Sequence, residues 1–134
     1  MSPEKLVETY TTAVSQGDFE RLRELVHADA TFGGTVVSEA RGGDAFVQGF
    51  RNLRPITLRT SIRSTVIEAD RAAIMYDLIT DTPVGSVLCS EFLTFDTGHV
   101  RSSTLIFDWR RWPEVINELR RRTTLAPTDC LHGI

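Results

Sequence analysis

The chain has 134 residues, of which 41% are hydrophobic and 25% are charged, and its formal net charge at pH 7 is −3. These values are ordinary for a globular protein and exclude a disordered chain, while the negative charge argues against a nucleic-acid-binding protein. No apolar run approaches the roughly 18 residues of a membrane-spanning helix, and the N-terminal residues lack the pattern of a secretory signal, so we expect no membrane partner.

Helical spacing of apolar side chains dominates the first 30 residues. Ser2-Pro3 can cap a first helix, which Gly17 ends. Asp18 can cap a second helix, and the stretch 27–30, which contains His27, is predicted to end it. A histidine at that place is expected to complement the helix dipole rather than to act as a catalytic base.

The segment that follows is predicted to contain one short strand, a loop and a third helix. Residues 31–32 begin the strand, and the four glycines of residues 33–43 are typical of a loop. Asp44 can cap the third helix, which closes before Pro55.

After Pro55 the hydrophobic period changes from that of a helix to that of a strand. Short connections join the predicted strands, so they should form an antiparallel meander. The strands are Leu58–Glu68, Ala72–Asp81, Ser86–Phe95 and Val100–Asp108. A last helix follows Pro113, and residues 123–134 lack periodicity and are predicted to be a tail. We therefore expect one domain, residues 1–122, with an α+β fold: a cone in which the N-terminal helices pack into a curved antiparallel sheet.

The cysteines and the missing motifs restrict the chemistry. Cys89 and Cys130 lie far apart without the spacing of metal ligands, which predicts two free thiols in a reducing cytoplasm. The histidines are scattered, and there is no glycine-rich phosphate loop, nucleophile elbow or zinc motif. We expect neither a cofactor nor a metal site.

One acidic residue is predicted to point into the cone. Glu91 shares a strand face with Leu93 and Phe95, and a carboxyl in an apolar interior needs a partner, a proton or a function. Inward polar groups beneath a curved sheet are candidates for a pocket. The predicted pocket residues are Tyr76, Cys89, Leu93, Leu105, Phe32 and Phe50.

Several short motifs suggest a family. They are Gly17-Asp18, His27-Ala28-Asp29-Ala30, the strand and turn from Glu91 to Val100, and the strand ending Ile106-Phe107-Asp108. In this order they resemble the nuclear transport factor 2-like superfamily, and within it the SnoaL-like and ketosteroid-isomerase-like branch. The resemblance covers most of the chain and implies a cystatin-like cone, a scaffold that serves isomerases, hydrolases, cyclases, dehydratases and binding proteins.

The resemblance to ketosteroid isomerases implies half of an active site. By position, Tyr10 and Glu91 match the tyrosine and the protonated acid that stabilise an oxyanion in that group. The general base of that group falls on Gly34, which cannot abstract a proton. The acid that the epoxide-hydrolase and polyketide-cyclase branches place on the last strand falls on Leu105.

Three interpretations of Tyr10 and Glu91 remain open. The pair can bind an apolar carbonyl-containing ligand in a pocket that lacks an evident base, or it can serve an isomerase, dehydratase or cyclase whose base is unidentified. It can also be purely structural, with Glu91 accepting a hydrogen bond from Tyr10. If the oxyanion hole is competent, placing an aspartate at Gly34 should promote proton abstraction from a cyclic enone.

The other face of the sheet is also predicted to be apolar. Leu88, Phe92, Val100 and Ile106 should project away from the helices, which implies that this face is covered. Because such faces commonly pair in the superfamily that the chain resembles, we expect a homodimer.

Overall fold

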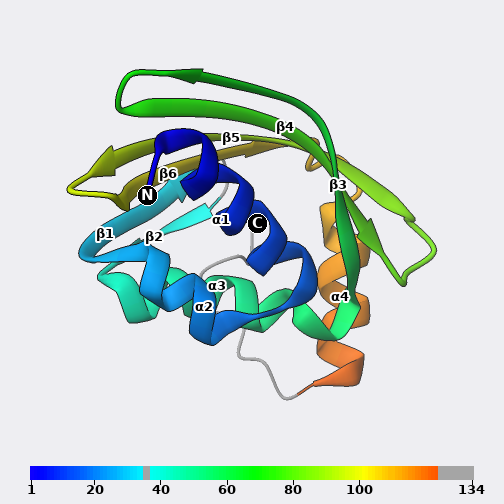
Figure 1. The fold of residues 1–134 in the computed structure, drawn as a ribbon. Helices are drawn as coiled ribbons and strands as arrows, with labels where there is room; N and C mark the ends of the chain where they lie inside the picture. Colours follow the sequence, from blue (N-terminus) through cyan, green and yellow to red (C-terminus); the bar gives the residue numbers. More distant parts are fainter. Residues whose placement is uncertain (35–36, 124–134) are drawn as a thin grey trace.

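The computed structural model describes residues 1–34 and 37–123, which form one sheet and its covering helices (Figure 1). In chain order the elements are α1 (Pro3–Gln16), α2 (Phe19–Leu25), β1 (Val26–Gly34), β2 (Val37–Arg41), α3 (Gly43–Leu53), the short 3-10 helix η1 (Arg54–Ile56), β3 (Thr57–Glu68), β4 (Arg71–Thr80), β5 (Ser86–Asp96), β6 (His99–Phe107) and α4 (Trp112–Arg122). The predicted tail, including Cys130, lies outside the described residues apart from its first position.

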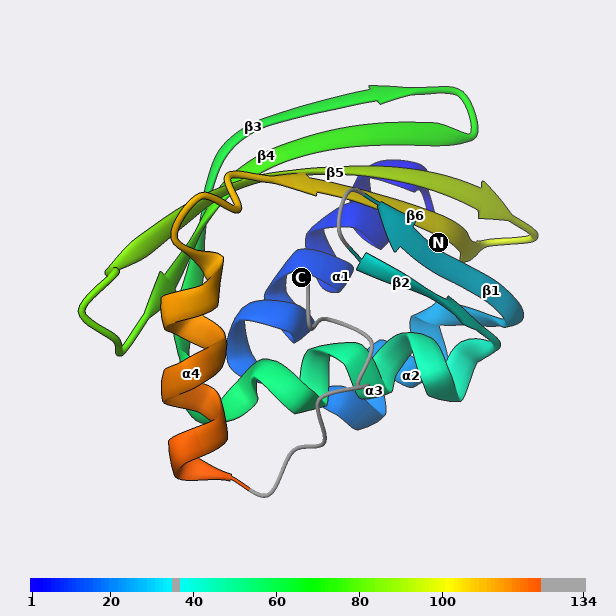
Figure 2. The same ribbon diagram turned by 180° about the vertical axis from the view of Figure 1, so that it is seen from behind.

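The six strands lie in the order β2-β1-β6-β5-β4-β3, and all neighbours are antiparallel except β1 and β6, which are parallel. Figures 1 and 2 show the sheet curving over α1, α2 and α3, with α4 beside the end of α3. The α+β cone predicted from the sequence is confirmed. No helix in the described part of the chain combines the length and the apolar character that crossing a bilayer requires.

The first helix begins and ends as the sequence predicts, and the second begins as predicted. The Ser2 side chain accepts a hydrogen bond from the Lys5 amide at 3.2 Å, and Gly17 ends α1 with a left-handed φ of 69°. The Asp18 carboxylate accepts one from the Arg21 amide at 3.1 Å and caps α2.

The segment between α2 and α3 differs from the prediction. Residues 27–30 belong to β1, which starts directly after α2, and β2 occupies part of the predicted loop. Strand β1 pairs with β6, which lies about 70 residues away in sequence, and β2 pairs back onto β1. Partners so distant leave no local signal, so the helical interpretation of residues 27–30 is wrong because tertiary pairing overrides local preference.

The start of α3 also differs from the prediction. Gly42 occupies the N-cap position and gives no side-chain cap, and Asp44 lies inside the first turn. The Asp44 carboxylate instead accepts a hydrogen bond from Arg23 Nε at 2.7 Å, which ties α3 to α2.

The outer face of the sheet is apolar as predicted, but Val100 does not belong to it. Leu88, Phe92 and Ile106 are exposed as predicted, at 43%, 48% and 47%. Val100 is fully buried. A bulge shifts the register of β5 and β6 between Thr94 and Phe95, which reverses the face on which Val100 lies.

Candidate functional site

The centre of the site is the Glu91 carboxylate on β5, of which only 1% is exposed. Three hydroxyl groups from three elements donate to it. Tyr10 of α1 donates to Oε2, Tyr76 of β4 donates to Oε1 at 2.8 Å, and Ser103 of β6 donates to Oε2 at 2.9 Å. The buried carboxylate is therefore fully hydrogen-bonded within the protein.

Strand register brings these groups together. Glu91 lies opposite Ile74 on β4 and Leu105 on β6. Tyr76 and Ser103 stand two residues from those positions, so their side chains reach Glu91 diagonally on the concave face. The buried face of α1 supplies Tyr10, whose ring packs edge-on against Phe46 and Phe50.

Burial controls the protonation of this cluster. Burial raises the pKa of Glu91 above 4.5, although the three hydroxyl donors oppose that change. Burial, and then the charge of Glu91, raises the pKa of Tyr10 and of Tyr76 well above 10.0, so both phenols keep their protons. The same two effects raise the pKa of Cys89 to about 12, which keeps it a thiol and a poor nucleophile.

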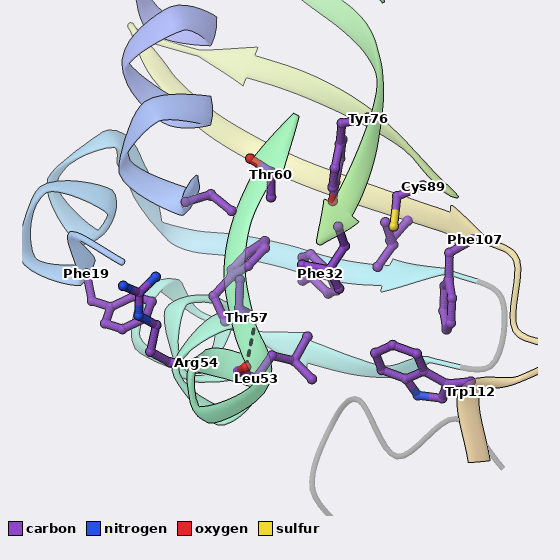
Figure 3. A pocket seen from close by; sticks show the side chains of 14 residues that line it. Phe19, Phe32, Leu53, Arg54, Thr57, Thr60, Tyr76, Cys89, Phe107 and Trp112 are labelled. Carbon is purple, nitrogen blue, oxygen red and sulfur yellow. Dashed lines mark hydrogen bonds between the residues drawn. The ribbon is translucent and has the colours of Figure 1, made fainter. Parts of the chain in front are cut away.

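A cavity adjoins this cluster between the sheet and the helices (Figure 3). The space between its side chains measures about 620 Å³ with the solvent at its mouth included, but the centres of water molecules can reach only about 40 Å³ of it. A ligand larger than a few water molecules must therefore move side chains to enter. Its lining consists of Val14, Phe19, Phe32, Phe50, Leu53, Arg54, Thr57, Thr60, Tyr76, Leu78, Cys89, Leu105, Phe107 and Trp112.

Most of the predicted pocket residues line this cavity. Leu93 does not: it is buried in the core beside Ser103. Tyr10 and Glu91 are together, but they do not line this cavity; with Tyr76 they line a smaller neighbouring space of about 220 Å³, open solvent included. Tyr10 donates its hydrogen bond to Glu91, so in this structure the two groups do not converge as donors on a common point.

Sequence reasoning missed Ser103 as a partner of Glu91. The signal was present, because Ser103 alternates with Leu105 and Phe107 along β6, and all three side chains are buried. A small polar residue on an inward face is a candidate partner for an inward acid. The cavity residues Arg54 and Trp112 were also missed. They come from η1 and α4, and the alternation of side chains along the strands gives no information on these elements.

Gly34 cannot carry the missing base without a change in the backbone. Its φ is 150°, and a Cβ built there would lie 1.8 Å from the Leu105 carbonyl oxygen. The expectation that aspartate at this position would complete an active site is therefore wrong for steric reasons. His27 lies on β1, where its Nδ1 accepts a hydrogen bond from the Asp29 amide at 2.9 Å, and it does not line the cavity. The sequence predicted that His27 would lie at the end of a helix, and it lies in a strand instead.

The described residues offer no site for a metal ion. They contain no group of three or more histidine, cysteine, aspartate or glutamate side chains placed to hold one. Nor does any buried side-chain nitrogen or oxygen among them lack a hydrogen-bond partner.

Solved structures with the same fold support this architecture. A protein from Kribbella flavida is 23% identical, with a TM-score of 0.76 over 89% of this chain and 96% of its own. A protein with a cystatin-like fold from Silicibacter pomeroyi is 14% identical, with a TM-score of 0.75 over 91% and 86%. A protein from Catenulispora acidiphila with a ketosteroid-isomerase-like fold, solved in complex with trimethylamine, is 14% identical, with a TM-score of 0.70 over 90% and 95%.

At these identities the similar structures establish the fold and leave the activity open. A comparison with curated proteins gives no match. The sequence itself matches the model of the SnoaL-like domain over residues 7–103, a span that includes Tyr10, Tyr76, Glu91 and Ser103. The chain therefore belongs to the SnoaL-like domain family of the nuclear transport factor 2-like superfamily.

Proposed function

We propose that this protein binds a small apolar carbonyl-containing molecule in the cavity beside Tyr76. Glu91 and Tyr10, which do not line the cavity, would determine whether the Tyr76 hydroxyl can donate a hydrogen bond to the ligand. The observation that carries the proposal is that Tyr76 joins the two parts of the site: it lines the cavity, and its hydroxyl donates a hydrogen bond to Glu91. Apolar walls with few polar groups are typical of small-molecule sites.

Proton counting explains how the cluster would bind a carbonyl. When Glu91 is ionised, the hydroxyls of Tyr10, Tyr76 and Ser103 all donate to it. When Glu91 is protonated, it donates its proton to one of these hydroxyl oxygens, and that hydroxyl is free to donate elsewhere. Of the three residues only Tyr76 lines the cavity. When Tyr76 is the hydroxyl that accepts the Glu91 proton, its own hydrogen becomes available to a ligand carbonyl.

Binding is favoured over catalysis because the cavity wall offers no suitable base. Its described lining contains no carboxylate and no imidazole, and the pKa of the Cys89 thiol is raised to about 12. An isomerase, dehydratase or cyclase would need such a base within hydrogen-bond reach of the ligand.

A reducing cytoplasm stays the predicted compartment, on the basis of cysteine content.

Acetophenone and toluene form a matched pair of probes, because both present one aromatic ring and only the first carries a carbonyl. Below the pKa of Glu91 we expect acetophenone to bind about 2- to 10-fold more tightly, and above it the two should bind equally. Tyr76→Phe should remove the difference at every pH, whereas Ser103→Ala should retain it. NMR chemical-shift titrations would measure these affinities. Equal affinities at all pH values would contradict the role of Tyr76, and no binding of either probe would contradict the pocket function.

We also propose that the outer sheet face forms a homodimer. Met75 on β4 lies beside Leu88, Phe92 and Ile106 on the next two strands, and all four are more than 40% exposed. The partner that suits such a face is an equally apolar one, and a second copy provides it.

Light scattering coupled to gel filtration should give about twice the monomer mass of 15.0 kDa. Phe92→Lys should shift the protein to the monomer, because burying an unpaired charge in an interface costs several kcal/mol. Ala45→Lys, at an exposed position on α3, should leave the dimer intact. A monomeric wild-type protein would refute the proposal.

A further inference from the structure

We propose that the carbonyl-containing ligand also carries one carboxylate, and that Arg54 binds this carboxylate at the mouth of the cavity. This inference rests on the function proposed above, since it requires that the cavity binds a ligand. It adds the charge of the ligand and the residue that recognises it.

Exposure along the lining locates the mouth. Among the described lining residues only Arg54 is exposed, and Phe19, Thr57 and Thr60 beside it are half-buried. Phe107 and Trp112 are buried. Figure 3 shows Arg54 and Phe19 on one side of the cavity and Phe107 and Trp112 on the other. An elongated ligand would therefore have its apolar body inside and its end group at Arg54.

Charge decides which end group fits there. Arg54 is the only charged residue of the described lining, so a cation at the mouth would meet repulsion and an anion attraction. Several other arginines are paired with carboxylates, for example Arg63 with Asp77 at 2.8 Å. The Arg54 guanidinium has no such partner within the described residues, and its one hydrogen bond is a long one of 3.5 Å to the Ser15 carbonyl. Its planar fork remains available for the bidentate contact that a carboxylate makes.

The Arg54 guanidinium lies close to Gly17 at the end of α1. A Cβ on Gly17 would lie 2.7 Å from Arg54 Cζ, so the guanidinium occupies space that only a glycine leaves. The Ser15 hydroxyl accepts from the Thr60 amide at 3.1 Å and ties the same turn of α1 to β3. These contacts place the Arg54 guanidinium beside the last turn of α1.

A purely structural role for Arg54 makes a different prediction. The last turn of α1 contains no basic residue of its own, so Arg54 can supply the positive charge that favours a helix C-terminus. That role would affect stability and would not affect which ligand charge the cavity prefers.

Benzoate and benzamide test the proposal, because they have the same shape and differ in charge. We expect NMR titration at neutral pH and low ionic strength to show benzoate binding about tenfold more tightly than benzamide. Arg54→Met should lower this ratio to about one while benzamide affinity is retained. Arg120→Met, which removes the same charge from an exposed position outside the cavity lining, should leave the ratio unchanged.

The outcomes separate this inference from the function on which it rests. Equal binding of benzoate and benzamide by the wild-type protein, or an unchanged preference in Arg54→Met, would overturn the carboxylate assignment and leave the pocket function standing. Failure of both compounds to bind would overturn both.

Discussion

Glu91→Ala is expected to lower the free energy of unfolding by about 3–5 kcal/mol, the range typical for breaking a buried charged or hydrogen-bonded cluster. The substitution leaves the hydroxyls of Tyr10, Tyr76 and Ser103 without their acceptor and opens a cavity beside them. Urea denaturation at a fixed pH measures the change.

Glu91→Gln is the matched control. The amide keeps the volume and one acceptor oxygen, and its NH2 group can donate to a hydroxyl oxygen, so we expect a loss of about 1–2 kcal/mol. A loss for Glu91→Ala no larger than that for Glu91→Gln would show that the hydrogen-bonded cluster contributes little to stability.

Comparing the wild-type protein with Glu91→Gln over a range of pH reports the protonation of Glu91. Because burial raises its pKa in the folded state above 4.5, the folded protein holds this proton more tightly than the unfolded chain does. Its contribution to stability is complete below the unfolded pKa and decreases as the pH rises through the folded pKa. The stability of the wild-type protein relative to Glu91→Gln should therefore fall as the pH rises from about 4.5. An opposite slope would mean that the hydroxyl donors outweigh burial.

Gly34→Ala is the second substitution with a large expected effect. The added Cβ would lie 1.8 Å from the Leu105 carbonyl oxygen, and the φ of 150° disfavours any L side chain. The strand β1 must shift away from β6 to relieve the contact, so we expect a loss of about 3–4 kcal/mol in thermal or urea unfolding.

Gly33→Ala is a sharp control for this prediction. A Cβ at Gly33 meets nothing within 4 Å, and its φ is not in the left-handed region. We expect its stability to stay within about 0.5 kcal/mol of the wild-type value. Equal stability of the two variants would show that the close approach of β1 and β6 at this point relaxes without cost.

The contrast between the two glycines bears on the evolution of activity in this scaffold. An acidic base at Gly34 requires a different path of the backbone relative to Leu105, and a single substitution does not supply it. In a protein with this backbone, a base for proton abstraction would have to come from another position.

Local patterns in the sequence determined the fold class, most element boundaries and the inward direction of key side chains. Ser2, Gly17 and Asp18 act on the residues next to them, so their roles in α1 and α2 followed from local chemistry. Glu91 and Tyr76 were predicted to point inward because strand alternation depends only on neighbouring residues. Tyr10 was placed beside Glu91 by resemblance to a family, and spacing alone would not have joined them.

The tertiary structure decided the features that depend on segments far apart in the chain. The strand character of residues 27–30 follows from the pairing of β1 with β6, and Val100 is buried because of a bulge between β5 and β6. The obstruction at Gly34 comes from the Leu105 backbone, and Arg54 reaches the cavity because α1 ends beside η1. Such contacts join residues tens of positions apart, so no local pattern encodes them. They determine whether Gly34 can be replaced by a catalytic base and where the cavity opens beside the charge of Arg54.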